Sequence, residues 1–137
     1  MNAVEQKVVV RDQGKCARCG RHVAHLERGR AWSIHHRRPR GSGGTSLDWV
    51  NQPANLVVLC GSGTTGCHGW VERERTKAFD LGLLVSAIGV ATAMTTRLRH
   101  HEYGWVLLDN EGGYEAADEF GKDWATPASS ITGKDVT

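Results

Sequence analysis

The order of cysteine and histidine residues decides the fold expected for this chain. The decisive stretches are Cys16-Ala-Arg-Cys19, Ile34-His35-His36-Arg37-Arg38-Pro39, Asn55-Leu-Val-Val-Leu-Cys60 and Cys67-His68. Four thiols can hold one structural metal ion, and the histidines together with Asn55 can form a second site that performs chemistry. We therefore expect two sites with different roles in the first half of the chain.

The four cysteines predict a zinc site rather than disulfides. The N-terminus lacks a signal-peptide core, and no apolar run approaches the roughly 20 residues of a membrane span. We therefore expect a cytoplasmic protein whose thiols stay reduced. Cys16 and Cys19 have the two-residue gap of a metal knuckle, whereas six residues separate Cys60 from Cys67, a wider gap than usual. Four buried free cysteines are the alternative interpretation.

Charge is distributed unevenly along the 137 residues. Residues 1–79 contain 13 Lys/Arg against 6 Asp/Glu, and residues 80–137 contain 4 against 9. The basic half is the one with the cysteines and histidines, so it suits a polyanion such as nucleic acid, although a solvated basic surface fits equally. The acidic region from Glu102 onward is ill suited to gripping DNA and is expected to meet a protein partner or to turn away.

Hydrophobic periodicity predicts an α+β fold. Helices are expected at residues 2–13 and 68–81, and strands at 31–38, 56–59, 83–87, 94–98, 104–109 and 114–117. We divide the chain into residues 1–82 with the cysteines and histidines, a β-rich extension at 83–120 and a flexible tail at 121–137. The histidines outside the main motifs, at positions 22, 25, 100 and 101, are expected on the surface.

The ordered motifs of residues 12–72 resemble the HNH endonuclease family, the ββα-metal (His-Me finger) nucleases, in the subgroup framed by two cysteine pairs. The whole chain resembles small HNH proteins of actinobacterial phages. This resemblance implies a ββα-metal core stabilised by a four-cysteine zinc site. It also implies that the protein cleaves double-stranded DNA. In phages, such proteins take part in genome packaging together with the terminase or other packaging proteins.

The resemblance also assigns a role to each site residue. His36 is the general base, His35 and His68 bind a catalytic divalent metal, and Asn55 holds the long loop by hydrogen bonds. Glu72, one helical turn after His68, could bind the metal, orient His68 or do neither.

The chemistry of phosphodiester hydrolysis explains these residue types independently. A neutral imidazole can take a proton from water near pH 7, and a divalent cation can stabilise the charged phosphate; Mg²⁺, Mn²⁺, Ni²⁺ and Zn²⁺ all fit. Arg37, Arg38 and Arg40 lie beside the histidines in sequence and can grip flanking phosphates.

Three functions remain open at this point. The leading one is a metal-dependent endonuclease. The second is a zinc-ribbon module that binds nucleic acid or terminase without catalysis, in which His35 and His36 are ordinary strand residues. The third is a homing-type enzyme, for which the chain has little room to carry a recognition domain. The sequence does not indicate an oligomeric state.

Overall fold

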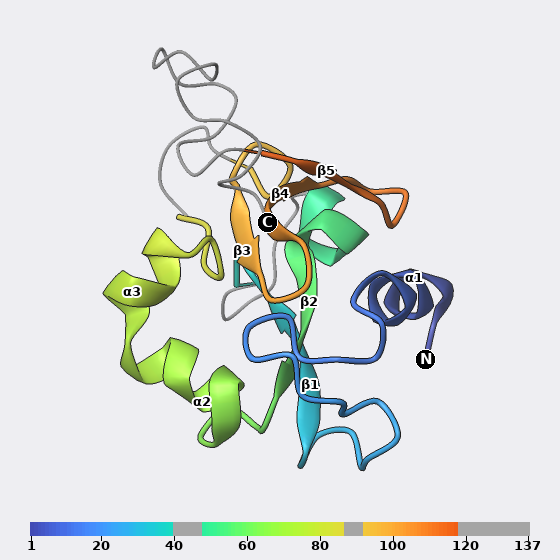
Figure 1. Cartoon of the computed structure of the whole chain (residues 1–137), viewed down its shortest axis with the longest axis vertical. Coiled ribbons are helices and arrows are strands. Elements are labelled where there is room, and N and C mark those ends of the chain that lie inside the picture. The colour runs from blue at the N-terminus through green and yellow to red at the C-terminus, as the bar shows by residue number, and fades with distance from the viewer. Residues whose placement is uncertain (40–47, 87–91, 118–137) are drawn as a thin grey trace.

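Two small antiparallel sheets and the helices around them make up the described part of this protein (Figure 1). The computed structural model describes residues 1–39, 48–86 and 92–117, so the expected tail at 121–137 lies outside it. In chain order the elements are α1 (Ala3–Arg11), β1 (Trp32–His36), the short 3-10 helices η1 (Asp48–Asn51) and η2 (Pro53–Asn55), β2 (Leu56–Cys60), α2 (Gly66–Arg73), α3 (Arg75–Asp80), β3 (Leu98–His100), β4 (Gly104–Leu108) and β5 (Tyr114–Ala116). The expected α+β class is confirmed.

The first sheet pairs β1 with β2 and lies at the centre of the molecule. The register sets Trp32 opposite Cys60 and His36 opposite Leu56, so this pair carries one zinc-ligand candidate and both adjacent histidines. Every residue of β2 is buried, because α1 packs on one side of the pair and α2 on the other (Figure 1). This strand–loop–strand–helix order brings His68 of α2 beside His35 of β1.

The helix expected at residues 68–81 is broken into two. α2 ends at Arg73 and α3 begins at Arg75, with Glu74 at φ −117° and ψ 55° between them. Neither proline nor glycine stands at the break, so local propensity does not predict it. Val71 of α2 and Ala78 of α3 are both fully buried, which shows that each helix packs separately onto the core.

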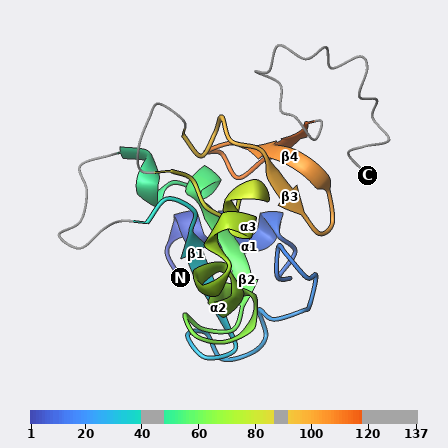
Figure 2. The same cartoon turned by 90° about the vertical axis from the view of Figure 1, so that its left-hand side faces the viewer.

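The second sheet has the order β3-β4-β5 and lies at one end of the first (Figures 1 and 2). The turn expected after β4 is present, since Asp109 Oδ1 accepts hydrogen bonds from the backbone N–H groups of Glu111 and Gly113. The strand expected at 94–98 begins only at Leu98. Residues 83–86 form no strand although Leu83, Leu84 and Val85 are buried, and Ala87 lies outside the described residues.

One hydrophobic core runs through both sheets. Leu59 from β2, Leu83 from the segment after α3, and Leu98 from β3 belong to the same buried cluster. The 83–120 region that the sequence suggested as an extension therefore shares its core with residues 1–82 over the residues described. Within those residues, no helix is long and apolar enough to cross a membrane.

A buried polar network ties the end of α1 to both sheets. Asp12 accepts hydrogen bonds from Arg11, from the backbone of Val58 and from His100 Nε2, which lies 2.9 Å from Asp12 Oδ1. His100 Nδ1 accepts the backbone N–H of Glu102, so this ring is the neutral tautomer with its proton on Nε2. His100 is 2% exposed, so the expectation that it is a surface residue is wrong.

The same network explains the titration of Asp12. Burial raises the pKa of its carboxyl, but the charge of Arg11 and the hydrogen bonds from His100 and Arg11 outweigh that effect and lower the pKa below the usual 3.8. Arg11 also donates to the carbonyls of Pro53 and Leu56, which closes the network onto β2.

We expect Asp12→Asn to lower the free energy of unfolding by about 3–5 kcal/mol, because it leaves the buried Arg11 charge without its carboxylate. Urea titration followed by circular dichroism measures this. The contribution of Asp12 is complete above its usual pKa and is lost as pH falls below it, so the gap between wild type and variant narrows on acidification. Glu27→Gln, which removes an exposed ion pair with Arg30, is the control and should change stability by less than about 1 kcal/mol.

Candidate functional site

The four cysteines come together as one cluster. All four sulfur atoms lie within 4.8 Å of one another, and Cys19 Sγ is 3.8 Å from Cys60 Sγ. Tetrahedral zinc with Zn–S bonds of about 2.3 Å places its ligands roughly 3.8 Å apart, so the spacing suits such an ion. Cys16, Cys60 and Cys67 are buried, whereas Cys19 is exposed at the knuckle. The cluster can hold a structural metal such as zinc.

The wide gap between Cys60 and Cys67 closes as a tight loop. Ser62 N–H donates to Thr65 Oγ1, and the backbone N–H of Cys67 lies 3.3 Å from Cys60 Sγ. Gly66 has φ +61°, and a Cβ there would lie 2.7 Å from the carbonyl oxygen of Cys60, so only glycine fits. Six residues therefore suffice to turn the chain from β2 into α2 with both sulfurs on one side.

The surroundings of the cluster affect the protonation and the charge of its thiols. Hydrogen bonding to Cys67 and burial raise the pKa of the Cys16 thiol, so metal binding releases its proton. Arg18 Nη1 lies 3.3 Å from Cys67 Sγ and offsets part of the negative charge of four thiolates. The backbone N–H of Ala17 donates to Val58 O at 2.7 Å, which straps the knuckle onto β2.

His35 and His68 face each other across the junction of β1 and α2. Their ring centres are 5.1 Å apart, close to the roughly 5 Å expected of two imidazoles that bind one ion. His35 is 3% exposed, and burial lowers its pKa to about 4; burial also lowers the pKa of the half-buried His68. Both rings are therefore neutral at pH 7, as metal ligands must be.

Hydrogen bonds fix which nitrogen of each ring is free. His35 Nε2 lies 2.7 Å from Leu83 O, a carbonyl that only accepts, so Nε2 carries the proton and Nδ1 keeps its lone pair. Ser33 Oγ donates to Gly61 O and therefore accepts from His68 Nδ1, which leaves His68 Nε2 with its lone pair. Histidine ligands of metals are held in this way by partners on the opposite nitrogen.

His36 lies apart from this pair. Strand alternation turns it to the α1 side of β1, where it borders a cavity of about 430 Å³ shared with Asn2, Glu5 and Arg28. Its Nε2 is 3.0 Å from Asn51 Oδ1, an atom that accepts only, so Nδ1 is the basic nitrogen of the ring. The structure thus brings His35 and His68 together and leaves His36 at the end of the strand, facing the other way.

Asn55 braces the chain around the histidines. Its side chain is fully buried, accepts the backbone N–H of Arg38 at 2.8 Å and donates to the carbonyls of Arg38 and Val50. These bonds join the start of the long loop after β1 to the end of η1. Residues 40–47 between them, including Arg40, lie outside the described residues.

Arg37 is not a phosphate-binding residue, contrary to expectation. It is 0% exposed, and its guanidinium donates to four backbone carbonyls, those of Gly82, Ala54, Ala93 and Thr96. Burial lowers its pKa to about 9, and no carboxylate pairs with it in the described part of the chain. A run of arginines in the sequence resembles a basic surface, but strand alternation and burial turn this one inward.

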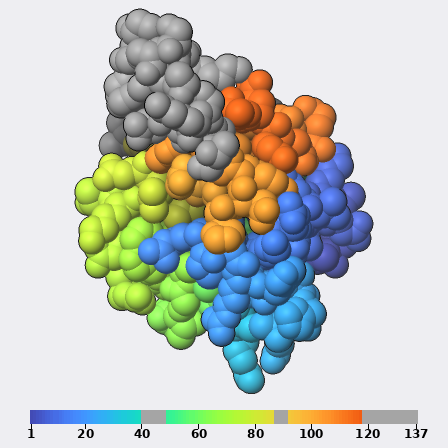
Figure 3. All heavy atoms as spheres, viewed as in Figure 1, coloured from blue at the N-terminus to red at the C-terminus, as the bar shows by residue number. Residues whose placement is uncertain are grey.

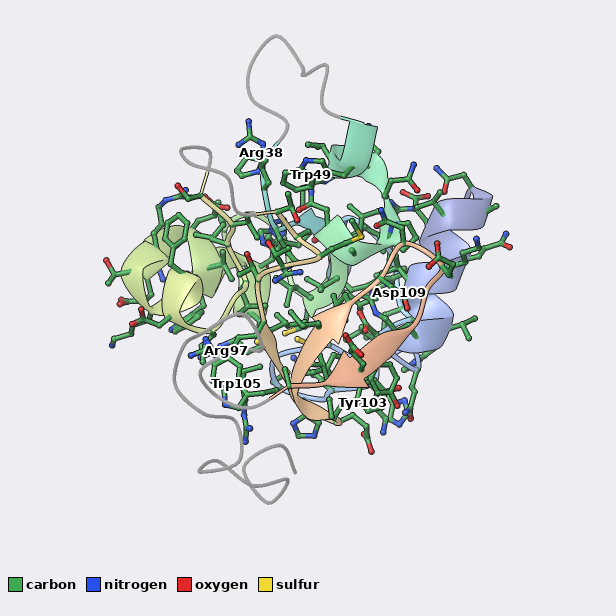
Figure 4. The ribbon with its side chains drawn as sticks, turned by 90° about the horizontal axis from the view of Figure 1, so that it is seen from above. Arg38, Trp49, Arg97, Tyr103, Trp105 and Asp109 are labelled. Carbon is green, nitrogen blue, oxygen red and sulfur yellow. The ribbon has the colours of Figure 1, made fainter. Side chains whose placement is uncertain are left out.

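Arg38 is the member of the run that reaches outward. It is half-buried, its guanidinium carbon lies 5.9 Å from the centre of the Trp49 ring, and Figure 4 shows the two side chains together at the edge of the molecule. Glu72 pairs with Arg75 at 3.3 Å on the exposed side of α2. The charge of Glu72 also acts on His68, where it opposes the lowering of the pKa by burial.

Sequence reasoning missed three groups that position the histidines, namely Ser33, Asn51 and the carbonyl of Leu83. Ser33 was recognisable in principle, since it is two residues from His35 and therefore on the same face of β1. Asn51 and Leu83 contact the histidines only because the tertiary fold brings them there. Comparisons with family models, with curated proteins and with solved structures find no match for this chain.

Removal of the metal should unfold the domain, because the cluster joins the knuckle, β2 and α2 in a small core. We expect one zinc per chain by elemental analysis and loss of the cooperative melting transition after treatment with a strong chelator. Cys16→Ser should have a similar effect. A chelated, zinc-free sample that keeps its full melting transition would contradict this structural role.

Replacement of the two adjacent arginines should change stability by very different amounts. Arg37→Lys is expected to reduce the free energy of unfolding by about 3 kcal/mol or more, because one ammonium cannot satisfy four buried carbonyls. Arg38→Gln should change it by less than about 1 kcal/mol. Urea unfolding of the two variants measures this, and equal stability losses would refute the assignment of Arg37 as a structural residue.

Proposed function

We propose that this protein is a metal-dependent endonuclease of the HNH type that hydrolyses phosphodiester bonds of duplex DNA. The observation that carries the proposal is the His35–His68 pair. Two neutral imidazoles from β1 and α2 stand 5.1 Å apart, each with one nitrogen held by a partner and the other left with its lone pair. Two neutral rings at this separation, each oriented by a hydrogen bond on one nitrogen, are suited to bind one metal ion.

The surrounding fold supports the same proposal. β1, a long loop, β2 and α2 follow one another in the order expected of a ββα-metal core, with Asn55 bracing the loop. A divalent cation on His35 Nδ1 and His68 Nε2 would neutralise phosphate charge and stabilise the leaving oxygen. The resemblance in motif order described above points to the same chemistry and to duplex DNA as the substrate.

In this proposal His36 removes a proton from the attacking water. Its Nε2–H donates to Asn51 Oδ1, which orients the ring, and an imidazole suits this role near neutral pH. In this proposal the scissile phosphate lies at the end of β1, where the side chains of His35 and His36 leave opposite faces of the strand. In the same proposal Arg38, at the start of the loop, contacts a neighbouring phosphate.

A second candidate is a zinc-stabilised DNA-binding module without catalysis. One observation favours it, namely that strand alternation turns His36 away from His35 and His68. A binding module predicts that DNA is retained but never cut, whatever divalent metal is supplied. Cleavage separates the two candidates.

A plasmid nicking assay with Mg²⁺, Mn²⁺ or Ni²⁺ tests the proposal, with histidine variants as reporters. We expect His36→Ala to lower the cleavage rate at least about 100-fold while the variant still binds DNA and the divalent metal. His35→Ala and His68→Ala should lose both cleavage and binding of the divalent metal, measured by calorimetry. His25→Ala, on an exposed loop, is the matched control and should cut normally.

Two outcomes would count against these assignments. Undiminished cutting by the His36→Ala variant refutes His36 as the base while the nuclease function stands. Absence of cutting by the folded, zinc-loaded wild type with every metal refutes the nuclease function and favours the binding module.

A further inference from the structure

A basic pocket lies away from the histidine site, where the zinc knuckle meets the second sheet. It has a volume of about 390 Å³ and is lined by Arg18, Leu81, Arg99, His100 and His101. The knuckle and the turn between β3 and β4 come together beside α2 and α3 on the face shown in Figure 3. No acidic residue of the described chain lines the pocket.

The zinc knuckle positions the β3–β4 turn directly. The backbone N–H of His101 donates to Ala17 O at 2.6 Å, and that of Arg99 donates to Leu81 O at 2.9 Å. Gly20 has φ +81°, and a Cβ on it would overlap the ring of His101. The lining groups therefore come from three separate segments that backbone contacts hold in register.

The two arginines of this pocket differ in how far other groups already neutralise their charge. Arg18 stacks on Trp70, with its guanidinium carbon 3.6 Å from the ring centre. It also contacts Cys67 Sγ, so the cysteine cluster neutralises part of the positive charge of Arg18. Arg99 is exposed and forms no ion pair with any described residue. Glu102, the acidic residue of the adjoining turn, is paired with Lys15 at 3.2 Å.

Positive charge continues from the pocket along the second sheet. Trp105 of β4 lies between two guanidinium groups, with that of Arg97 4.2 Å and that of Arg99 5.8 Å from its ring centre. Figure 4 shows Arg97 and Trp105 side by side at the sheet surface. Two guanidinium groups at the Trp105 ring thus extend the positive charge of the pocket onto the second sheet, which suits a polyanion.

We propose that the pocket formed by Arg18, Arg99 and His101 binds the phosphodiester backbone of duplex DNA, as a second contact in addition to the histidine site. Arginine guanidinium groups bind phosphate oxygens bidentately, and such contacts position a protein on DNA without reading sequence. The choice of DNA as ligand rests on the proposed function. The segment after residue 82 then contributes to DNA binding through Arg99 and His101. The expectation that the acidic region from Glu102 onward meets a protein partner or turns away from DNA stays a prediction.

Salt-dependent binding of a fluorescent 20-base-pair duplex tests this inference, using the zinc-loaded full chain without added divalent metal so that no cleavage occurs. Arg99→Gln should weaken binding roughly tenfold and lower the slope of log K against log salt by about 0.9, the value for one lost phosphate contact. Lys77→Gln is the matched control, since it removes one exposed positive charge on α3 outside the pocket. It should change affinity less than about twofold.

An Arg99→Gln variant that binds DNA with the affinity and salt slope of the Lys77→Gln variant overturns the inference. With that result, the melting temperature in inorganic phosphate shows what the pocket binds instead. If phosphate raises the melting temperature of the wild type but not of the Arg99→Gln variant, the pocket binds small phosphates and not DNA. The outcome is independent of cleavage. If DNA binding depends on Arg99 but no nicking is seen, the DNA-binding role of the pocket is supported and the nuclease proposal is rejected. If the protein nicks DNA but Arg99→Gln binds DNA as well as the wild type, only the DNA-binding role of the pocket is rejected.

Discussion

The cluster of four thiols is the constraint on which the rest of the structure depends. It joins the knuckle after α1, the end of β2 and the start of α2, three segments that a core of this size would hold weakly by apolar contact alone. His68 follows Cys67 directly, so the geometry of the cluster also sets the position of that ring. The β3–β4 turn rests on the same knuckle through His101. The cysteine cluster therefore positions both the histidine pair and the basic pocket.

Arg37 makes a second connection, between the end of β1 and the segments that follow α3. A buried guanidinium is costly unless its donors are satisfied, and here four carbonyls from residues 54, 82, 93 and 96 satisfy them. Those carbonyls come from both sides of the boundary that the sequence suggested at residue 82. The segment after α3 is therefore part of one core, and the carbonyl of Leu83 it supplies sets the tautomer of His35.

The two adjacent histidines illustrate how a strand separates neighbours in sequence. His35 is enclosed, neutral and opposite His68, whereas His36 faces the α1 side and is held by Asn51. The resemblance in motif order assigned them different roles, and the structure gives them different surroundings. The proposed nuclease function requires both rings to reach one phosphate, and their opposite orientation is the observation that favours the binding module instead.

The sequence by itself determined the elements and residues whose signals are local. Cysteine spacing predicted the thiol cluster, apolar patterns predicted α1, β1, β2 and β4, and the glycines around the wide cysteine gap allowed it to close. Only the tertiary structure decided that Arg37 and His100 are buried, that the 68–81 helix breaks at Glu74, and that Ser33, Asn51 and Leu83 hold the histidines. The physical reason is that burial and hydrogen-bond partners depend on segments distant in the chain. A charged or polar side chain carries the same local signal whether it faces solvent or a set of buried carbonyls.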